Sequence, residues 1–276
     1  MEIKKIIHIA DIHIRTFRMH EEYGAAFKTF LKKIRELVKP YKREEIRIVI
    51  AGDYVHQKIT ISNELLILGT WFLRKLDKVA PVVIIPGNHD LLENNKDRVD
   101  SITPMVKLLP DLNIQYYTET GCYLDNNVVW DVYSIVTGSD RPSIEDARID
   151  YGNDKTYIGL FHGPLIGSTT DIGYEIEHGH SLEIFEGNDI VMCGDMISET
   201  VLKRGVYKPK YYIIATYSGN HYELVTYKNK NIFSFYEIPY DILLNIKRGC
   251  STDNISKKEK KTLFHYIPIF NSFLSV

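Results

Sequence analysis

The stretch Val82-Val83-Ile84-Ile85-Pro86-Gly87-Asn88-His89-Asp90 is the most informative part of this chain. Four apolar residues run into a proline and then into a polar tetrapeptide, the pattern of a buried strand that ends in a loop. Its last three residues offer a carboxamide, an imidazole and a carboxylate, which can ligate a metal ion or transfer a proton. The sequence therefore predicts a functional site at a strand end, provided that other strands deliver similar groups.

Three other apolar runs are followed by polar residues of the same kind. Asp11 and His13 follow residues 5–10, Asp53 follows residues 47–51, and His162 follows residues 157–161. Without a thiolate among them, these groups suit Mn²⁺, Fe²⁺, Zn²⁺ or Mg²⁺ better than soft metals. A metal site assembled from the ends of successive strands is the expectation.

Hydrophobic periodicity predicts an α/β fold. Helices are expected over 21–39, ended by Pro40, and over 62–79, capped by Ser62, because apolar residues recur there at helical spacing. The strands between them are short and almost wholly apolar, as expected where helices cover the sheet. Further strands are predicted over 113–118, 128–136, 157–161, 190–193, 211–217, 221–227 and 232–238. A helix-rich half followed by a strand-rich half indicates two facing mixed sheets flanked by helices.

The 276 residues are 44% hydrophobic and 25% charged, an ordinary globular composition. The three cysteines lie far apart and predict no disulfide framework, so we expect a reducing compartment, the cytoplasm or the host cytoplasm of a virus. Neither a signal peptide nor an apolar stretch of membrane-spanning length is predicted.

Charge is unevenly distributed along the chain. Residues 1–200 carry a balance of −9 and residues 201–276 a balance of +7, within a total of −2. The basic last quarter either faces an anionic partner or forms a solvated lysine-rich surface. Residues 1–240 are expected to form the main domain, and residues 241–276 a basic linker with a short C-terminal segment.

The ordered motifs Asp11-x-His13, Gly52-Asp53, 87–90 and an isolated His162 resemble those of the calcineurin-like metallophosphoesterases over residues 5–195. The resemblance implies a four-layer α-β-β-α fold. Residues 8–13, 52–56 and 101–104 are also similar to the SbcCD-type, meiotic-recombination-type DNA repair nucleases, especially their phage versions.

This resemblance implies a role for each residue. Asp11 and His13 would bind a first metal, Asn88 and His162 a second, and Asp53 would bridge both, with Mn²⁺ the expected ion. A hydroxide activated by both metals would attack phosphorus. His89 would protonate the leaving oxygen or stabilise the transition state, Asp90 would orient His89, and Arg15 is assigned to substrate binding.

The family's final Gly-His-x-His motif is altered here. Asp195 stands at the first histidine position and is assigned to the second metal, whereas Ile197 stands at the second and cannot ligate. Three explanations stay open: a weak first metal site completed by water or another side chain, a divergent copy with reduced activity, or a local sequence disruption.

The expected function is that of a metal-dependent DNA exonuclease or endonuclease subunit in repair or recombination. Its expected partners are DNA, a coiled-coil ATPase of the SMC type and a second copy of the chain, with no membrane. Two alternatives remain: a phosphatase or phosphodiesterase acting on another substrate, and a catalytically weakened scaffold subunit.

Overall fold

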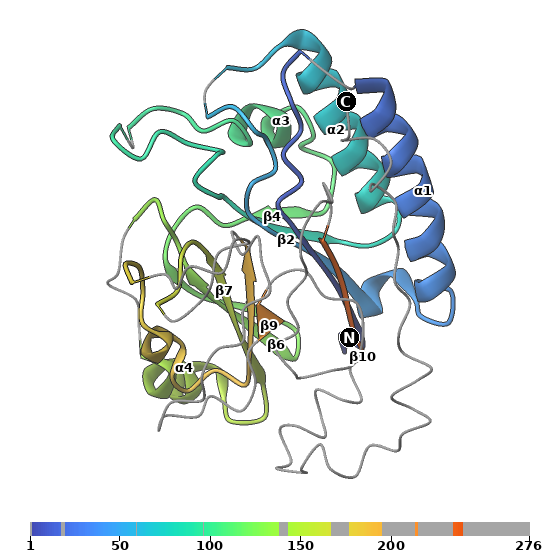
Figure 1. The fold of residues 1–276 in the computed structure, drawn as a ribbon. Coiled ribbons are helices and arrows are strands. Elements are labelled where there is room, and N and C mark those ends of the chain that lie inside the picture. The colour runs from blue at the N-terminus through green and yellow to red at the C-terminus, as the bar shows by residue number, and fades with distance from the viewer. Residues whose placement is uncertain are drawn as a thin grey trace.

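The structure is a computed structural model that describes residues 2–17, 20–58, 60–95, 97–137, 143–166, 177–194, 213–214 and 234–239, the last two segments by their backbone alone. Two five-stranded sheets form its centre, and helices lie on the outer faces (Figure 1). The predicted α-β-β-α arrangement is confirmed.

The first sheet carries the strands that lead into the N-terminal motifs. Its order is β10-β1-β2-β3-β4, and all neighbours are parallel except β10, which pairs antiparallel with β1. The strands are β1 (Lys5–Ala10), β2 (Ile46–Ala51), β3 (Val82–Ile85), β4 (Ile114–Tyr116) and β10 (Ser234–Pro239). Because β1, β2 and β3 are parallel, their carboxyl ends lie at one edge of the sheet.

The second sheet has the order β5-β6-β7-β8-β9. β5 and β6 form an antiparallel hairpin, and the remaining neighbours are parallel. The strands are β5 (Gly121–Asp125), β6 (Val128–Tyr133), β7 (Thr156–His162), β8 (Ile190–Gly194) and β9 (Ile213–Ile214).

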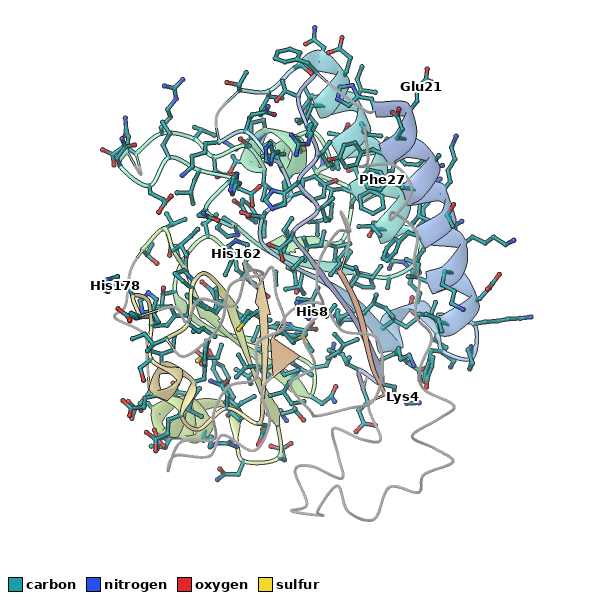
Figure 2. All side chains as sticks on the ribbon, viewed as in Figure 1. Lys4, His8, Glu21, Phe27, His162 and His178 are labelled. Carbon is teal, nitrogen blue, oxygen red and sulfur yellow. The ribbon has the colours of Figure 1, made fainter. Side chains whose placement is uncertain are left out.

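Alternation along each inner strand distributes apolar side chains between two cores. In β2, Ile48 and Ile50 join the cluster under the helices, whereas Val49 and Ala51 join the cluster between the sheets. α1 (His20–Val38), α2 (Asn63–Asp77) and the short α3 (Thr103–Lys107) cover the first sheet, and α4 (Ile144–Tyr151) packs on the second. Phe27 of α1, which is labelled in Figure 2, stacks on Phe72 of α2 with ring centroids 3.9 Å apart.

Most predicted elements lie where expected, with ends shifted by a few residues. Ser62 caps α2 by accepting the Leu65 N–H at 3.2 Å, as predicted. Strand β5 and helix α4 were not predicted, because β5 contains a glycine and only two residues of α4, Ile144 and Ala147, are buried apolar side chains. The strand expected over 211–217 is described only at β9, and the one expected over 221–227 lies outside the described residues.

Candidate metal centre

The candidate site lies where the carboxyl ends of β1, β2, β3 and β7 meet. Beyond β1 and β2 the chain continues as two paired loops, in which the N–H of Asp11 donates to the Gly52 carbonyl at 3.2 Å and that of His13 to the Asp53 carbonyl at 2.9 Å. Asp11, His13 and Asp53 have φ values of 54°, 51° and 53°. Three non-glycine residues in the left-handed region are strained, and such strain gathers at functional sites. The turn that Asp11 and His13 need in order to converge is therefore present.

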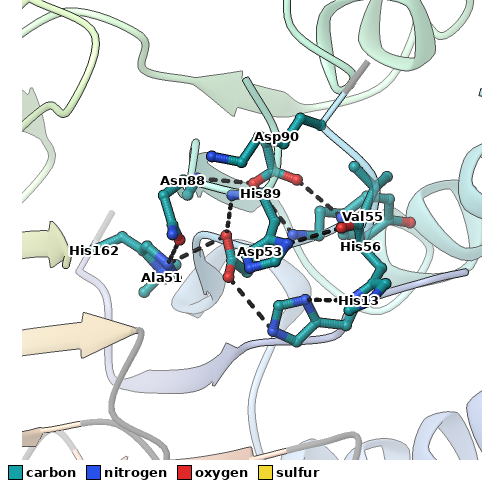
Figure 3. Close-up of polar contacts among 12 residues, drawn as sticks. His13, Ala51, Asp53, Val55, His56, Asn88, His89, Asp90 and His162 are labelled. Carbon is teal, nitrogen blue, oxygen red and sulfur yellow. Dashed lines mark hydrogen bonds and ion pairs between the residues drawn. The ribbon is translucent and has the colours of Figure 1, made fainter. Parts of the chain in front are cut away.

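Asp53 occupies the centre of the cluster (Figure 3). Its Oδ2 lies 3.4 Å from Nε2 of His13, and its Oδ1 lies 3.2 Å from Nε2 of His162. The backbone N–H of His89 donates to Oδ1 at 2.8 Å. The two oxygens of one buried carboxylate thus face ligand nitrogens that come from different sheets.

His162 and Asn88 complete the side of the cluster next to the second sheet. Nε2 of His162 lies 3.1 Å from Oδ1 of Asn88, while Nδ1 donates to the carbonyl of Ala51 at 2.8 Å. The ring is fully buried and fits closely, because a Cβ atom on Gly52 or on Gly194 would collide with it. Donation from Nδ1 fixes the tautomer that keeps a lone pair on Nε2, the atom that faces Asp53 and Asn88.

Three half-buried histidines form the outer wall of the site. The rings of His56 and His89 stack with centroids 5.3 Å apart, and His13 meets both edge-on. Nδ1 of His56 lies 3.4 Å from Nδ1 of His13, and Nδ1 of His89 donates to the His56 carbonyl at 2.8 Å. His56 therefore belongs to the site, although from the sequence it was included only within the motif over residues 52–56 and was assigned no role.

Asp90 supports the site in a different way from the one the resemblance implies. Its fully buried carboxylate accepts N–H groups from Gly87 at 2.8 Å, from Val55 at 2.9 Å and from Tyr54 at 3.2 Å. The group that holds the ring of His89 is the carbonyl of His56. Asp90 instead ties the loop after β3 to the loop after β2, which keeps Asn88 and His89 beside Asp53.

The protonation of the cluster suits cation binding. Burial lowers the pKa of His13 to about 4, so its ring is neutral and retains a lone pair at neutral pH. Burial alone would raise the pKa of Asp53, but His162, His13 and the N–H of His89 hold it at about 2. The centre thus presents an ionised carboxylate beside the neutral ring of His13.

Two overlapping donor sets fit divalent cations. Ligand atoms of Asp11, His13 and Asp53 all lie within 4.8 Å of one another. On the other side of the carboxylate, Nε2 of His162 lies 3.2 Å from Oδ1 of Asp53 and 3.1 Å from Oδ1 of Asn88. Mixed nitrogen and oxygen donors of this kind suit first-row divalent metals and Mg²⁺.

The structure brings together the predicted residues Asp11, His13, Asp53, Asn88, His89, Asp90 and His162. Arg15 lies on the loop after β1, two residues beyond His13. Asp195 and Ile197 lie outside the described residues, so the prediction for the final motif stays a prediction.

The matched family model is the one for calcineurin-like phosphoesterases, and it covers residues 4–197. The chain belongs to this family. Members are hydrolases that depend on divalent metal ions, and the cluster around Asp53 contains a candidate site for such ions. The match spans the candidate metal-site residues of both sheets.

A curated relative is "Uncharacterized protein R555" of Acanthamoeba polyphaga mimivirus, 34% identical over 203 residues. The match covers 71% of this chain and 15% of that protein, so the chain spans a small part of its relative's length. TT1561 of Thermus thermophilus is a solved structure with 11% identity and a TM-score of 0.41, covering 90% and 96% of the two chains. A cold-active protein tyrosine phosphatase matches with 16% identity and a TM-score of 0.24, over 47% of this chain and 40% of that chain.

None of the described helices combines the length and the apolar character needed to cross a lipid bilayer.

Proposed function

We propose that the chain is a metal-dependent nuclease that hydrolyses phosphodiester bonds in DNA. The observation that carries the proposal is the division of the Asp53 carboxylate between His13 on one side and His162 with Asn88 on the other. A single carboxylate with two sets of neighbours is what a pair of cations about 3.5–4 Å apart requires. Bound cations would supply an activated hydroxide and charge stabilisation for phosphoryl transfer.

The chain's own residues would then orient the reaction. Asn88 and His162 are fixed by the close packing between the sheets, which defines where a phosphoryl oxygen can approach. His89 is anchored through Nδ1–H, so Nε2 is the atom that would face the leaving oxygen and would donate a proton to it when the ring is in the imidazolium form. Proton donation helps an alkoxide leave, as the hydrolysis of a diester requires.

The assignment to DNA is supported by sequence. Residues 8–13, 52–56 and 101–104 resemble the SbcCD-type repair nucleases, and residues 201–276 carry a balance of +7 that suits a polyanion. Within this proposal Mn²⁺ is the metal, an SMC-type coiled-coil ATPase and a second copy are the protein partners, and the cytoplasm of a cell or of a virus-infected host is the location.

The test compares substrates and metals. The chain is incubated with Mn²⁺, Mg²⁺ or EDTA and with labelled single-stranded DNA, double-stranded DNA, bis-p-nitrophenyl phosphate and p-nitrophenyl phosphate. We expect Mn²⁺-dependent cleavage of DNA and of the diester, lost in His89→Ala. Hydrolysis of the monoester alone would favour a phosphatase, and tight metal binding without turnover would favour a scaffold subunit.

Calorimetric titration with Mn²⁺ tests the altered final motif. Two sites are expected, one of them weakened because Ile197 cannot ligate. Ile197→His should strengthen that site and raise activity. Two equally tight sites in the unaltered chain would refute the weakened site.

A further inference from the structure

The loop after β1 carries two side chains outside the set of metal-site residues. Arg15 follows the ligand His13 by two residues and is half-buried, and Phe17 is 73% exposed. A large apolar ring this exposed is unusual in a chain whose other aromatic side chains supply much of the core. Both residues follow the candidate ligand His13 closely in the chain, by two and four positions.

Backbone contacts hold this loop in place. Ile14 forms a parallel bridge with Val55, and the Arg15 carbonyl accepts a hydrogen bond from Nε2 of His20 at 2.7 Å. The N–H of Thr16 donates to Oε1 of Gln57 at 2.9 Å. Arg15 is therefore anchored on both sides, which fixes its position relative to the metal centre.

The positive charge of Arg15 lies beside the histidine wall. After burial, this charge is the largest cause that lowers the pKa of His56, the ring stacked on His89. The same guanidinium, by charge and hydrogen bonding, opposes the burial that raises the pKa of Tyr23 to about 12. Tyr23 in turn donates its hydroxyl proton to the carbonyl of His13 at 2.5 Å. The guanidinium is thus placed between α1 and the outer wall of the site.

In the described part of the chain, no carboxylate forms an ion pair with Arg15. A guanidinium has five N–H donors in a planar fork that matches a phosphate group. Next to a centre that hydrolyses phosphoesters, the ligand that best suits this group is a second phosphate of the substrate.

We propose that Arg15 and Phe17 form a subsite for an unpaired nucleotide next to the scissile phosphate. Arg15 binds the neighbouring phosphate, and Phe17 stacks on the base. This inference rests on the proposed function and specifies its substrate as a single strand or a frayed end. Stacking requires an unpaired base with an open face, and proteins that bind single strands without sequence preference combine basic side chains with exposed aromatic rings.

Fluorescence anisotropy tests the subsite with the 276-residue chain in Mn²⁺. The probe is a short fluorescein-labelled oligothymidylate with phosphorothioate linkages that slow hydrolysis, and a second probe has the same backbone without bases. Arg15→Ala should weaken binding of both probes and reduce the slope of log K against log salt by about 0.7, the value for one phosphate contact on a single strand.

Phe17→Ala should weaken binding of the oligothymidylate by roughly tenfold, leave the salt slope unchanged and have no effect on the abasic probe. Phe17→Trp should retain affinity. The matched controls are Arg35→Ala, in the last turn of α1, and Ile149→Ala, an 80% exposed apolar residue on α4, and both should bind as the unaltered chain does.

The proposal fails if Arg15→Ala leaves the salt slope unchanged, or if Phe17→Ala weakens both probes equally. It also fails if duplex DNA or a glutamate-rich peptide binds through these residues as tightly as the oligothymidylate. Cleavage of an unmodified oligonucleotide is measured in parallel. If the chain cleaves DNA while these binding effects are absent, only the subsite is wrong. If the effects are present without cleavage, the subsite stands and the nuclease function fails.

Discussion

Oδ1 of Asp53 lies 3.2 Å from Nε2 of His162, so a carboxylate after the first sheet meets an imidazole at the end of a strand of the second sheet. The metal centre is therefore complete only when the two sheets pack together. A ligand that binds only the folded state stabilises it in proportion to the logarithm of its concentration over Kd. Metal binding should thus be linked to the stability of the whole fold.

Asp53→Asn should abolish this linkage. The variant keeps the size of the side chain but loses the anionic oxygen that faces both donor sets. We expect Mn²⁺ to raise the unfolding temperature of the unaltered chain and to have little effect on Asp53→Asn, measured by differential scanning fluorimetry. Asp111→Asn, an exposed control, should respond to Mn²⁺ normally. An equal response of Asp53→Asn would show that the metals bind elsewhere.

His89→Ala should separate catalysis from metal binding. The side chain of His89 is directed by the His56 carbonyl, and its contact with Asp53 runs through the backbone N–H, which alanine retains. We expect kcat on bis-p-nitrophenyl phosphate to fall about 10²–10⁴-fold, the usual range for loss of a general acid. Calorimetry should show the Mn²⁺ stoichiometry of the unaltered chain; loss of a bound metal would instead identify His89 as a ligand.

Gly87→Ala should weaken metal binding by displacing Asp53. A Cβ atom on Gly87 would collide with Oδ1 and the backbone nitrogen of Asp53, two atoms of the bridging residue. We expect a weaker Mn²⁺ affinity by calorimetry and a lower stability in urea. Gly24→Ala is the matched control, because no heavy atom lies within 4 Å of its added Cβ. In helix α1 it should stabilise the chain by about 0.5–1 kcal/mol.

A buried ion pair far from the metal centre joins β2 to β5. Nε and Nη2 of Arg47 donate to the Asp125 carboxylate at 2.6 and 2.7 Å, and the indole of Trp130 donates to the same carboxylate at 3.2 Å. Asp125→Asn keeps an acceptor for Trp130 but leaves the Arg47 charge buried, which should cost about 3–5 kcal/mol in urea unfolding.

The double variant Arg47→Met with Asp125→Asn should recover part of that loss, because the isolated charge is gone. Metal affinity of the folded molecules should stay the same in both variants, since the pair lies at the opposite ends of the strands. If the double variant loses more unfolding free energy than Arg47→Met and Asp125→Asn lose together, the unpaired Arg47 charge is not what destabilises Asp125→Asn.

The first sheet could be predicted from the sequence because its inner strands are short runs of almost wholly apolar residues. β1 and β3 lie at the predicted residues, since each is an apolar run bounded by polar residues or proline. The site residues could also be predicted, because each of them follows such a run and parallel strands end at one edge. Local pattern and overall fold agree at these positions.

Other features depend on contacts that no local pattern contains. The place of His56 in the histidine wall follows from the pairing of Ile14 with Val55 and from the bond between its carbonyl and His89. The role of Asp90 depends on backbone N–H groups of Tyr54 and Val55, which lie 36 and 35 residues earlier. Such contacts are fixed by tertiary packing, so the sequence identified these residues without showing what they touch.

His8 should make the fold sensitive to acid. Its side chain on β1 is fully buried, and burial lowers its pKa from the ordinary 6.5 to about 3. Between these values the unfolded chain binds a proton at this residue and the native chain does not, so stability falls as pH decreases below about 6.5. The loss approaches about 1.4 kcal/mol per pH unit over that window.

His8→Gln, which cannot titrate, should therefore lose less stability than the unaltered chain between about pH 7.5 and pH 5, measured by urea unfolding in EDTA. His178→Gln, an exposed control, should lose as much as the unaltered chain. If His8→Gln and the unaltered chain lose equal stability over this range, the native state protonates His8, and its burial does not exclude the charged ring.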